Sequence, residues 1–440
     1  MSYSFARRLV AACLAVALAS VACSMAPRPG AEVSLLVAGD PAEIAAYREL
    51  IAAFATSSPG SNVKLIPASD RDELLTRLST SIAAGTPPDL FLVNYRFFAQ
   101  YAVRGALAPI GDRLAASSAL SEDQFFPEAI EAFRHDGVLQ CLAQNVSSLV
   151  VYYNRDMFKA AGQPEPPASW TWDEMFATTR AMTKDTDGDG TNDQHGLGVE
   201  PILARLAPFV WSNEGEIVDD VTTPTALSLR ESRAGYALLR FLDLGGGGEA
   251  AEGGPAPNLA VIPSDEQVEG EDLESRFMNG KLAMYMSSRR STPTFRTIQS
   301  FDWDVAPLPY HRRPSGVLHS DGYCMTAGSK AKDEAWQFME FAVGAEGQRI
   351  MAASGRTVPS LRKVAGSEAF LDPDERPARS QVFIDGIATL RAFPKISTWP
   401  EIEDAADVIL EQGMYGGLPA DDVITQLEEQ TRDAFSRDGG

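Results

Sequence analysis

A short acidic segment carries the side chains best suited to bind a metal ion. Five oxygen-bearing residues stand at every second position: Asp185, Asp187, Asp189, Thr191 and Asp193. Alternating oxygens can converge on a hard cation such as Ca²⁺, and Gly190 allows a sharp turn. A loop of this type needs a bidentate glutamate at its twelfth position, where Gly196 stands instead. The segment predicts either a structural calcium site completed by another segment, or an acidic turn without metal.

A second segment is unusually basic for a chain with a net charge of -22. Residues 287–296 include Ser287, Arg289 and Arg290, which we consider as ligand-binding residues. The planar guanidinium group recognises carboxylates, phosphates and vicinal hydroxyls. Salt bridges to the plentiful surface acids are the alternative for each arginine.

No segment has the spacing of a catalytic motif, so the chain is not expected to be an enzyme. G-x-S-x-G and H-E-x-x-H are absent, and the four histidines lack the spacing of metal ligands. A glycoside hydrolase needs only a suitably placed carboxylate pair, and the 60 acidic residues leave this class as an alternative. No cofactor is required. The acidic balance repels nucleic acid, so no polynucleotide partner is expected.

The start of the chain has the pattern of an export signal. Arg7 and Arg8 precede 13 apolar or small residues, too few to span a bilayer, which needs about 20. We predict a signal peptide over residues 1–22, lipid attachment at Cys23 and a tether over 23–30. The protein would then be anchored on the outer face of the cell membrane. Cleavage with full secretion is the alternative.

Strands and helices are expected to alternate over the next hundred residues. Strand patterns at 33–38, 63–66 and 89–93 are separated by helix patterns at 43–55 and 70–84, which indicates a parallel-type α/β fold. In such sheets ligands bind beyond the carboxyl ends of the strands. Four polar residues follow those ends and are predicted to bind ligand: Asp40, Asn94, Tyr95 and Arg96.

Six blocks of sequence, in order along the chain, are similar to those of one protein family. They are PPDLF (87–91) with GALAP (105–109), DG (136–137) with YNRDMF (153–158), PPASWTWDE (166–174), FMNGKLAM (277–284), WDVAPLP (303–309) and SKAKDEAWQF (329–338). Together they resemble the extracellular solute-binding proteins of ABC transporters, in the branch that includes maltose-binding protein.

This resemblance implies a two-lobed α/β fold of the periplasmic-binding-protein type II, with a ligand cleft between hinged lobes. One lobe would comprise residues 31–145 and 322–382, and the other 146–321 and 383–440. The implied function is to capture a carbohydrate and deliver it to the transmembrane subunits of an ABC importer. A monomer is expected, and a scaffold lipoprotein is the remaining alternative.

The resemblance also implies site residues. Gln144 and Asn145 would lie at the first chain crossing, and Asp321 and Gly322 near the second. Ligand contacts would come from Trp211, Asn213 and Trp399, although each tryptophan could instead pack in the core.

Two departures from the family pattern bear on the ligand. Arg96 stands where maltose-binding protein has an acid, and Arg290 where many relatives have a stacking tryptophan. Maltose is therefore not predicted, and an anionic solute such as a sugar phosphate, glycerol phosphate or uronate is the alternative to a neutral sugar.

The resemblance places Cys141 and Cys324 beside hinge crossings, although they are 183 positions apart. In an oxidising compartment they are predicted to form a disulfide. Two buried free thiols are the alternative.

Overall fold

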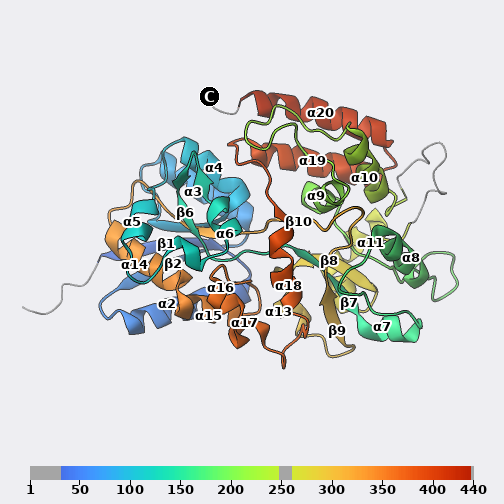
Figure 1. Ribbon diagram of the computed structural model, residues 1–440, viewed down its shortest axis with the longest axis horizontal. Helices are drawn as coiled ribbons and strands as arrows, with labels where there is room; N and C mark the ends of the chain where they lie inside the picture. Colours follow the sequence, from blue (N-terminus) through green and yellow to red (C-terminus); the bar gives the residue numbers. More distant parts are fainter. Residues whose placement is uncertain (1–30, 247–259, 438–440) are drawn as a thin grey trace, which may run out of the picture.

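The computed structural model describes residues 31–246 and 260–437, so the predicted signal peptide, Cys23 and the tether lie outside the described residues. Two α/β lobes lie side by side, and the chain passes between them in the middle of the view (Figure 1). This two-lobed arrangement confirms the expected fold class. Within the described ranges, no helix is long and apolar enough to cross a membrane.

The first lobe is built on a five-stranded sheet. Its strands, in spatial order, are β2 (Asn62–Ala68), β1 (Glu32–Ala38), β3 (Leu90–Asn94), β11 (Asp321–Met325) and β6 (Cys141–Ala143). β1 pairs in parallel with β2 and β3, as the alternating pattern predicts, whereas β11 is antiparallel to β3 and β6. A hairpin, β4 (Arg134–His135) and β5 (Val138–Leu139), lies beside it.

Helices of this lobe come from two separate parts of the chain. They are α2 (Pro41–Ser57), α3 (Arg71–Ala83), α4 (Tyr95–Val103), α5 (Gly111–Ala116), η1 (Glu122–Gln124), α6 (Pro127–Ala132), α14 (Lys332–Val343), α15 (Ala345–Ala353), α16 (Arg362–Ala365) and α17 (Glu368–Leu371). Leu50 and Phe54 of α2 share one buried cluster with Phe338 of α14 and Val37 of β1, so both parts of the chain build a single core.

The second lobe is built on an antiparallel sheet in which β7 (Leu149–Asn154) lies between β8 (Met284–Ser288) and β9 (Trp303–Ala306). Its helices are α7 (Arg155–Ala160), α8 (Trp172–Met182), α9 (Leu203–Ser212), α10 (Ser232–Leu242), α11 (Asp265–Gly270), α12 (Leu273–Met278), η2 (Arg289–Ser291), α13 (Thr292–Phe295), α19 (Trp399–Met414) and α20 (Ala420–Ser436). The predicted capping box opens α8: Thr171 accepts from the Glu174 amide, and Glu174 accepts from that of Thr171.

Three stretches of chain connect the lobes. Ser147 bridges to His319 on neighbouring extended segments, and β10 (Gly316–Val317) pairs in parallel with β12 (Leu390–Arg391). The third stretch includes α18 (Gln381–Asp385) and η3 (Ile387–Thr389). Inside the range predicted for the first lobe, Phe370 packs in a cluster with Tyr152 of the second lobe. The lobe boundaries therefore stay a prediction, and α17 contacts both lobes.

The structure joins Cys141 to Cys324 by a disulfide. The two residues face each other in the register of β6 and β11, which are neighbours in the first-lobe sheet. Both sulfur atoms therefore belong to one lobe, and the bond leaves the hinge free.

Candidate functional site

A cavity of about 570 Å³ lies between the lobes. Residues of β1, β3, α2 and α3 line it on the first-lobe side, and residues of α9 and the end of β8 on the second-lobe side. Seven of the residues predicted from the sequence line this cleft: Asp40, Asn94, Arg96, Asn145, Arg289, Arg290 and Asp321.

Strand ends bring three of these side chains together. Asn94 ends β3 and lies opposite Asp321, which begins the antiparallel strand β11, while Asn145 follows β6 at the same edge of the sheet. The Asn94 amide donates to one Asp321 carboxylate oxygen at 3.1 Å, and the Asn145 amide donates to the other at 2.9 Å. Two amides thus orient a carboxylate on the cleft wall, leaving further acceptor capacity for a ligand.

Two further carboxylates, those of Asp40 and Glu43, lie at the start of α2. Asp40 caps this helix by accepting from the amides of Ala42 and Glu43, and it forms an ion pair with Arg356. The Glu43 carboxyl also lies 3.6 Å from Arg356. It folds back over Gly39, where an added Cβ would come within 2.7 Å of Glu43 Oε2. Glycine at position 39 therefore makes room for the Glu43 side chain.

The surroundings of Glu43 favour its neutral form. Burial, followed by the nearby Asp321 carboxylate, raises the pKa of Glu43 to about 8, and Arg290 only partly opposes this. At neutral pH the Glu43 carboxyl is therefore mostly protonated, and it can donate a hydrogen bond as well as accept one.

The raised pKa of Glu43 predicts a loss of stability on the alkaline side. The unfolded chain releases this proton near pH 4.5, whereas the folded protein holds it up to about pH 8. The contribution of Glu43 to the free energy of unfolding is therefore full below pH 4.5 and is lost as the pH rises to 8. Denaturant unfolding at pH 5 and pH 8 should show a smaller decline for Glu43→Gln than for the wild type. Glu49→Gln, at an exposed position of the same helix, is the control. An equal decline in the free energy of unfolding of all three proteins would contradict the raised pKa of Glu43.

The second-lobe wall offers basic and imidazole groups. Arg205 pairs with Glu200, yet its Nε has no hydrogen-bond partner among the described residues. His319 Nε2 likewise has none, and burial together with nearby arginines holds the pKa of His319 well below its usual range. Arg290 is exposed and forms no salt bridge within the described part of the chain. Of these groups, the exposed Arg290 guanidinium keeps hydrogen-bonding capacity toward the cleft, whereas Arg205 Nε and His319 Nε2 are buried.

Arg289 lines the cleft, but other residues of the protein hold its guanidinium group. Its Nε donates to Gly355 O at 2.8 Å and Nη1 to Ser380 Oγ at 3.1 Å, and its guanidinium lies over Phe370 and Phe383. Burial lowers the pKa of Arg289 to about 10. Most of this side chain therefore holds β8 against residues 355–383, whereas Arg290 is free for a ligand.

Arg96 connects the two lobes. It projects from α4 of the first lobe and forms a buried ion pair with Glu403 on α19 of the second. Its guanidinium also lies 5.5 Å from the centre of the Phe97 ring. Because Glu403 already occupies this guanidinium, Arg96 contributes less to a solute than its place in the sequence suggests.

Neither predicted stacking residue presents its ring to the cleft. Trp211 is 2% exposed, lies 5.3 Å from the Phe393 ring and is covered by Arg391. Trp399 is fully buried and stacks on Phe393. Both rings pack in the second-lobe core, the alternative that the sequence left open. Phe97 is the only phenyl ring among the described residues lining the cleft, and Arg71 and Arg96 lie over it.

Five other predicted ligand residues lie outside the cleft lining. Tyr95 accepts from the Phe393 amide, Gln144 accepts from Tyr47 and Tyr323, Asn213 donates to Arg233 O, Ser287 bonds to Ser291, and Gly322 lies against Phe133. All five are buried, and their polar groups satisfy neighbouring strands and helices. These five residues therefore do not line the cleft, and the Tyr95 hydroxyl instead reaches Phe393 of the second-lobe core.

Sequence reasoning missed several lining residues: Glu43, Arg71, Glu200, Arg205, His319 and Arg356. Glu43 had a usable signal, because it lies in the first turn of the helix that follows β1. Arg356 had none, since it reaches Asp40 only through the packing of α15 against α2.

The acidic loop gathers three of its five predicted ligands. Carboxylate oxygens of Asp185, Asp187 and Asp193 all lie within 4.8 Å of one another. Asp185 accepts from the amides of Gly188 and Gly190, and both glycines have positive φ angles, which other residues rarely adopt. The loop can therefore present several oxygens to one cation.

Comparison with known proteins identifies the family. A family model described as bacterial extracellular solute-binding protein matches residues 49–378. A Brucella abortus protein that is named as a binding protein is 26% identical over 92% of this chain and 93% of its own length. The maltotriose-binding protein of Pyrococcus abyssi is 24% identical over 82% of this chain and 73% of its own length.

The fold has close counterparts among solved structures. An ABC substrate-binding protein of Listeria monocytogenes, solved in complex with cycloalternan, superposes with a TM-score of 0.82 at 21% identity. The match covers 92% of this chain and 99% of the Listeria chain. Together with the family match and the interlobe cleft, this agreement shows that the chain belongs to the bacterial extracellular solute-binding proteins.

Proposed function

We propose that this protein is the substrate-binding component of an ABC import system and captures a carbohydrate in the interlobe cleft. The observation that carries the proposal is the cleft wall formed by Asp321, Asn94 and Asn145, where two amides orient a carboxylate. Planar groups of this kind match the paired donors and acceptors of sugar hydroxyls. The Pyrococcus relative, named for maltotriose, and the Listeria structure with cycloalternan support a carbohydrate.

Capture would be followed by delivery to the transmembrane subunits of the importer. Closing the lobes on a solute would bury it between Asp321 on one side and Arg290 on the other, and the transporter could recognise the closed form. Membership of an extracellular family supports an extracytoplasmic location. Lipid attachment at Cys23, anchoring of a monomer on the outer face of the membrane and the absence of catalysis are parts of the same proposal.

An anionic carbohydrate or polyol phosphate is the second candidate. Arg290 is exposed in the cleft without a salt bridge among the described residues, and no uncovered aromatic face among them lines the cleft. A guanidinium group recognises phosphate or carboxylate through two parallel hydrogen bonds. The same residue also suits vicinal hydroxyls, so the two candidates differ in the charge of the solute and not in the site.

A ligand screen separates these candidates and tests the proposal. We expect one class among neutral sugars, sugar phosphates and uronates to raise the melting temperature, because a ligand of the native state stabilises it by mass action. Incubation with the hit should release no product, whereas a hydrolase would yield one. If none of the three classes of solute raised the melting temperature, the proposal of a carbohydrate site would be refuted.

Calcium is expected to stabilise the acidic loop. If Asp185, Asp187 and Asp193 bind the ion, calcium at about 100 times its Kd should stabilise the protein by about 2.7 kcal/mol. Differential scanning calorimetry with calcium and with chelator would measure this gain. Asp187→Asn should remove most of it, whereas Glu429→Gln, an exposed acid on α20, should not. Equal melting temperatures with calcium and with chelator would contradict calcium binding by the acidic loop.

A further inference from the structure

A second cavity, of about 340 Å³, lies on the opposite side of the first chain crossing from the cleft. Ser147 lines the cleft, whereas the next residue, Ser148, lines this second cavity. Successive side chains of an extended segment point to opposite faces, so the two cavities are separated by the backbone of the crossing. We call the second cavity the rear pocket.

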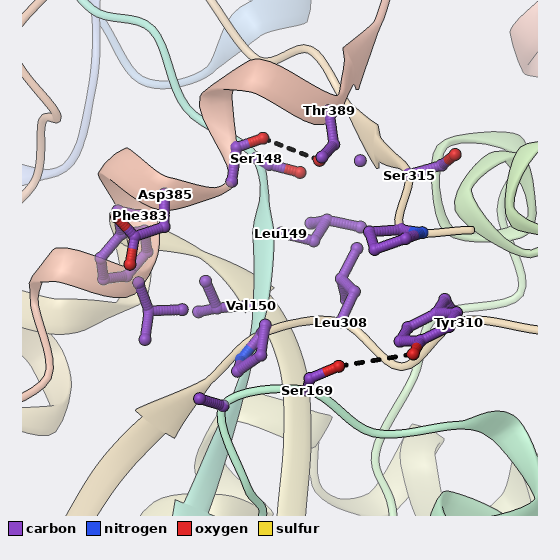
Figure 2. A pocket seen from close by; sticks show the side chains of 16 residues that line it. Ser148, Leu149, Val150, Ser169, Leu308, Tyr310, Ser315, Phe383, Asp385 and Thr389 are labelled. Atoms are coloured by element: carbon purple, nitrogen blue, oxygen red, sulfur yellow. Dashed lines mark hydrogen bonds between the residues drawn. The ribbon is translucent and has the colours of Figure 1, made fainter.

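All three connections between the lobes contribute to the rear pocket. Residues 148–150 follow the first crossing, 314–316 precede the second, and 382–389 belong to the third. Along the third, Phe383 packs with the second-lobe cluster and Ile387 with the first-lobe cluster. The pocket therefore lies at the hinge, and its walls come from segments far apart in sequence (Figure 2).

The body of the rear pocket is apolar. Its walls include Leu149, Val150, Leu308 and Phe383, which Figure 2 shows around the central space. The hydroxyls on its rim are largely paired inside the protein: Thr389 donates to Gly386 O at 2.8 Å, and Ser169 bonds to Tyr310 at 3.4 Å. A ligand would therefore gain mainly from burial of apolar surface.

The Ser148 hydroxyl in the rear pocket is buried without a hydrogen-bond partner among the described residues. Ser148 is 6% exposed, and its Oγ forms no hydrogen bond with any described residue. Gly316 lies against it, and a Cβ added there would come within 2.5 Å of this oxygen. Buried hydroxyls are normally hydrogen-bonded, so the unpaired hydroxyl of a residue that lines this pocket indicates a place for a ligand's polar atom.

The charge around the rear pocket limits what it can accept. Asp385 is exposed at its edge, and no lysine or arginine is among the described residues that line it. An anion would meet this carboxylate without a compensating cation. A volume of about 340 Å³ lies at the small end of ordinary ligand pockets, which run from about 300 to 1,000 Å³.

From these observations we propose that the rear pocket is a second binding site, separate from the solute cleft. It takes a small uncharged molecule with an apolar body and one hydroxyl, in the class of phenols and short alcohols. The apolar body contacts Leu308 and Phe383, and the hydroxyl forms a hydrogen bond with Ser148 Oγ.

Phenol is the probe, and toluene and benzoate are its comparators. Ligand-observed nuclear magnetic resonance should show phenol binding to the wild type more tightly than toluene, which lacks the hydroxyl, and than benzoate, which is charged. Ser148→Ala should weaken phenol binding by up to about tenfold, which corresponds to the loss of one hydrogen bond, and should leave the affinity for toluene unchanged. Loss of the preference for phenol in this variant is the signature of the proposed contact.

Two further variants locate the site. Leu308→Trp should fill the rear pocket and abolish phenol binding, while Asp321→Ala, in the cleft, should leave phenol binding intact. Melting curves establish that each variant is folded. Phenol binding that survives Leu308→Trp, or that is equally tight in the wild type and Ser148→Ala, would overturn the proposal, as would the absence of binding to the wild type.

Discussion

Asp321→Ala is expected to weaken solute binding by about 100-fold. Its carboxylate is held by the amides of Asn94 and Asn145 on the cleft wall, ready to accept from solute hydroxyls. Hydrogen bonds to a charged group contribute about 1.5–3 kcal/mol each, and the substitution also leaves both amides without their acceptor. Isothermal titration calorimetry with the solute identified by screening measures the change.

Two variants sharpen this test. Asp321→Asn keeps the size of the side chain and removes its charge, so it should bind with intermediate affinity. Asp385→Asn removes an exposed acid at the rear pocket and should bind the solute like the wild type. If Asp321→Ala is folded and binds with unchanged affinity, the solute does not bind at this wall.

Removing the disulfide is expected to lower the free energy of unfolding by about 2–5 kcal/mol, the range for native disulfides. Cys141 and Cys324 are 183 positions apart, so the bond restricts a large part of the unfolded chain. Replacing both by alanine avoids burying a new polar group in the first-lobe core, where both are fully buried. Guanidinium unfolding of the wild type and the double variant measures the difference.

The disulfide prediction has an internal control. A reductant should destabilise the wild type and leave the double variant unchanged, because the variant has no bond to lose. Solute affinity should change little, since both positions lie in one lobe and outside the cleft lining. Equal unfolding free energies with and without reductant would show that the bond does not contribute.

Local sequence patterns were sufficient for the elements of the first lobe. The strands β1, β2 and β3 and the helices between them follow from alternating apolar periodicity, and the observed bounds differ by only a few residues. The place of β11 in this sheet could not be derived in the same way. It pairs with β3 across more than 220 positions, and only the family resemblance indicated that this part of the chain returns to the first lobe.

The site could be predicted where backbone geometry decides it. Asp40 and Asn94 lie at the carboxyl ends of parallel strands, which meet at a common edge of the sheet, whereas Asp321, at the start of the antiparallel strand β11, was implied only by the family resemblance. Trp211 and Trp399 lie on helices, where a rotation of one residue turns a ring from the cleft into the core. The amino-acid type alone could not settle that direction.

A crystal structure of the protein with the carbohydrate found by screening tests the central claim most directly. We expect the sugar to lie between the lobes, with hydroxyls bonded to the Asp321 carboxylate on one wall and to Arg290 on the other. A stabilising carbohydrate bound outside this cleft, with Asp321 and Arg290 free of contacts, would contradict the proposed function.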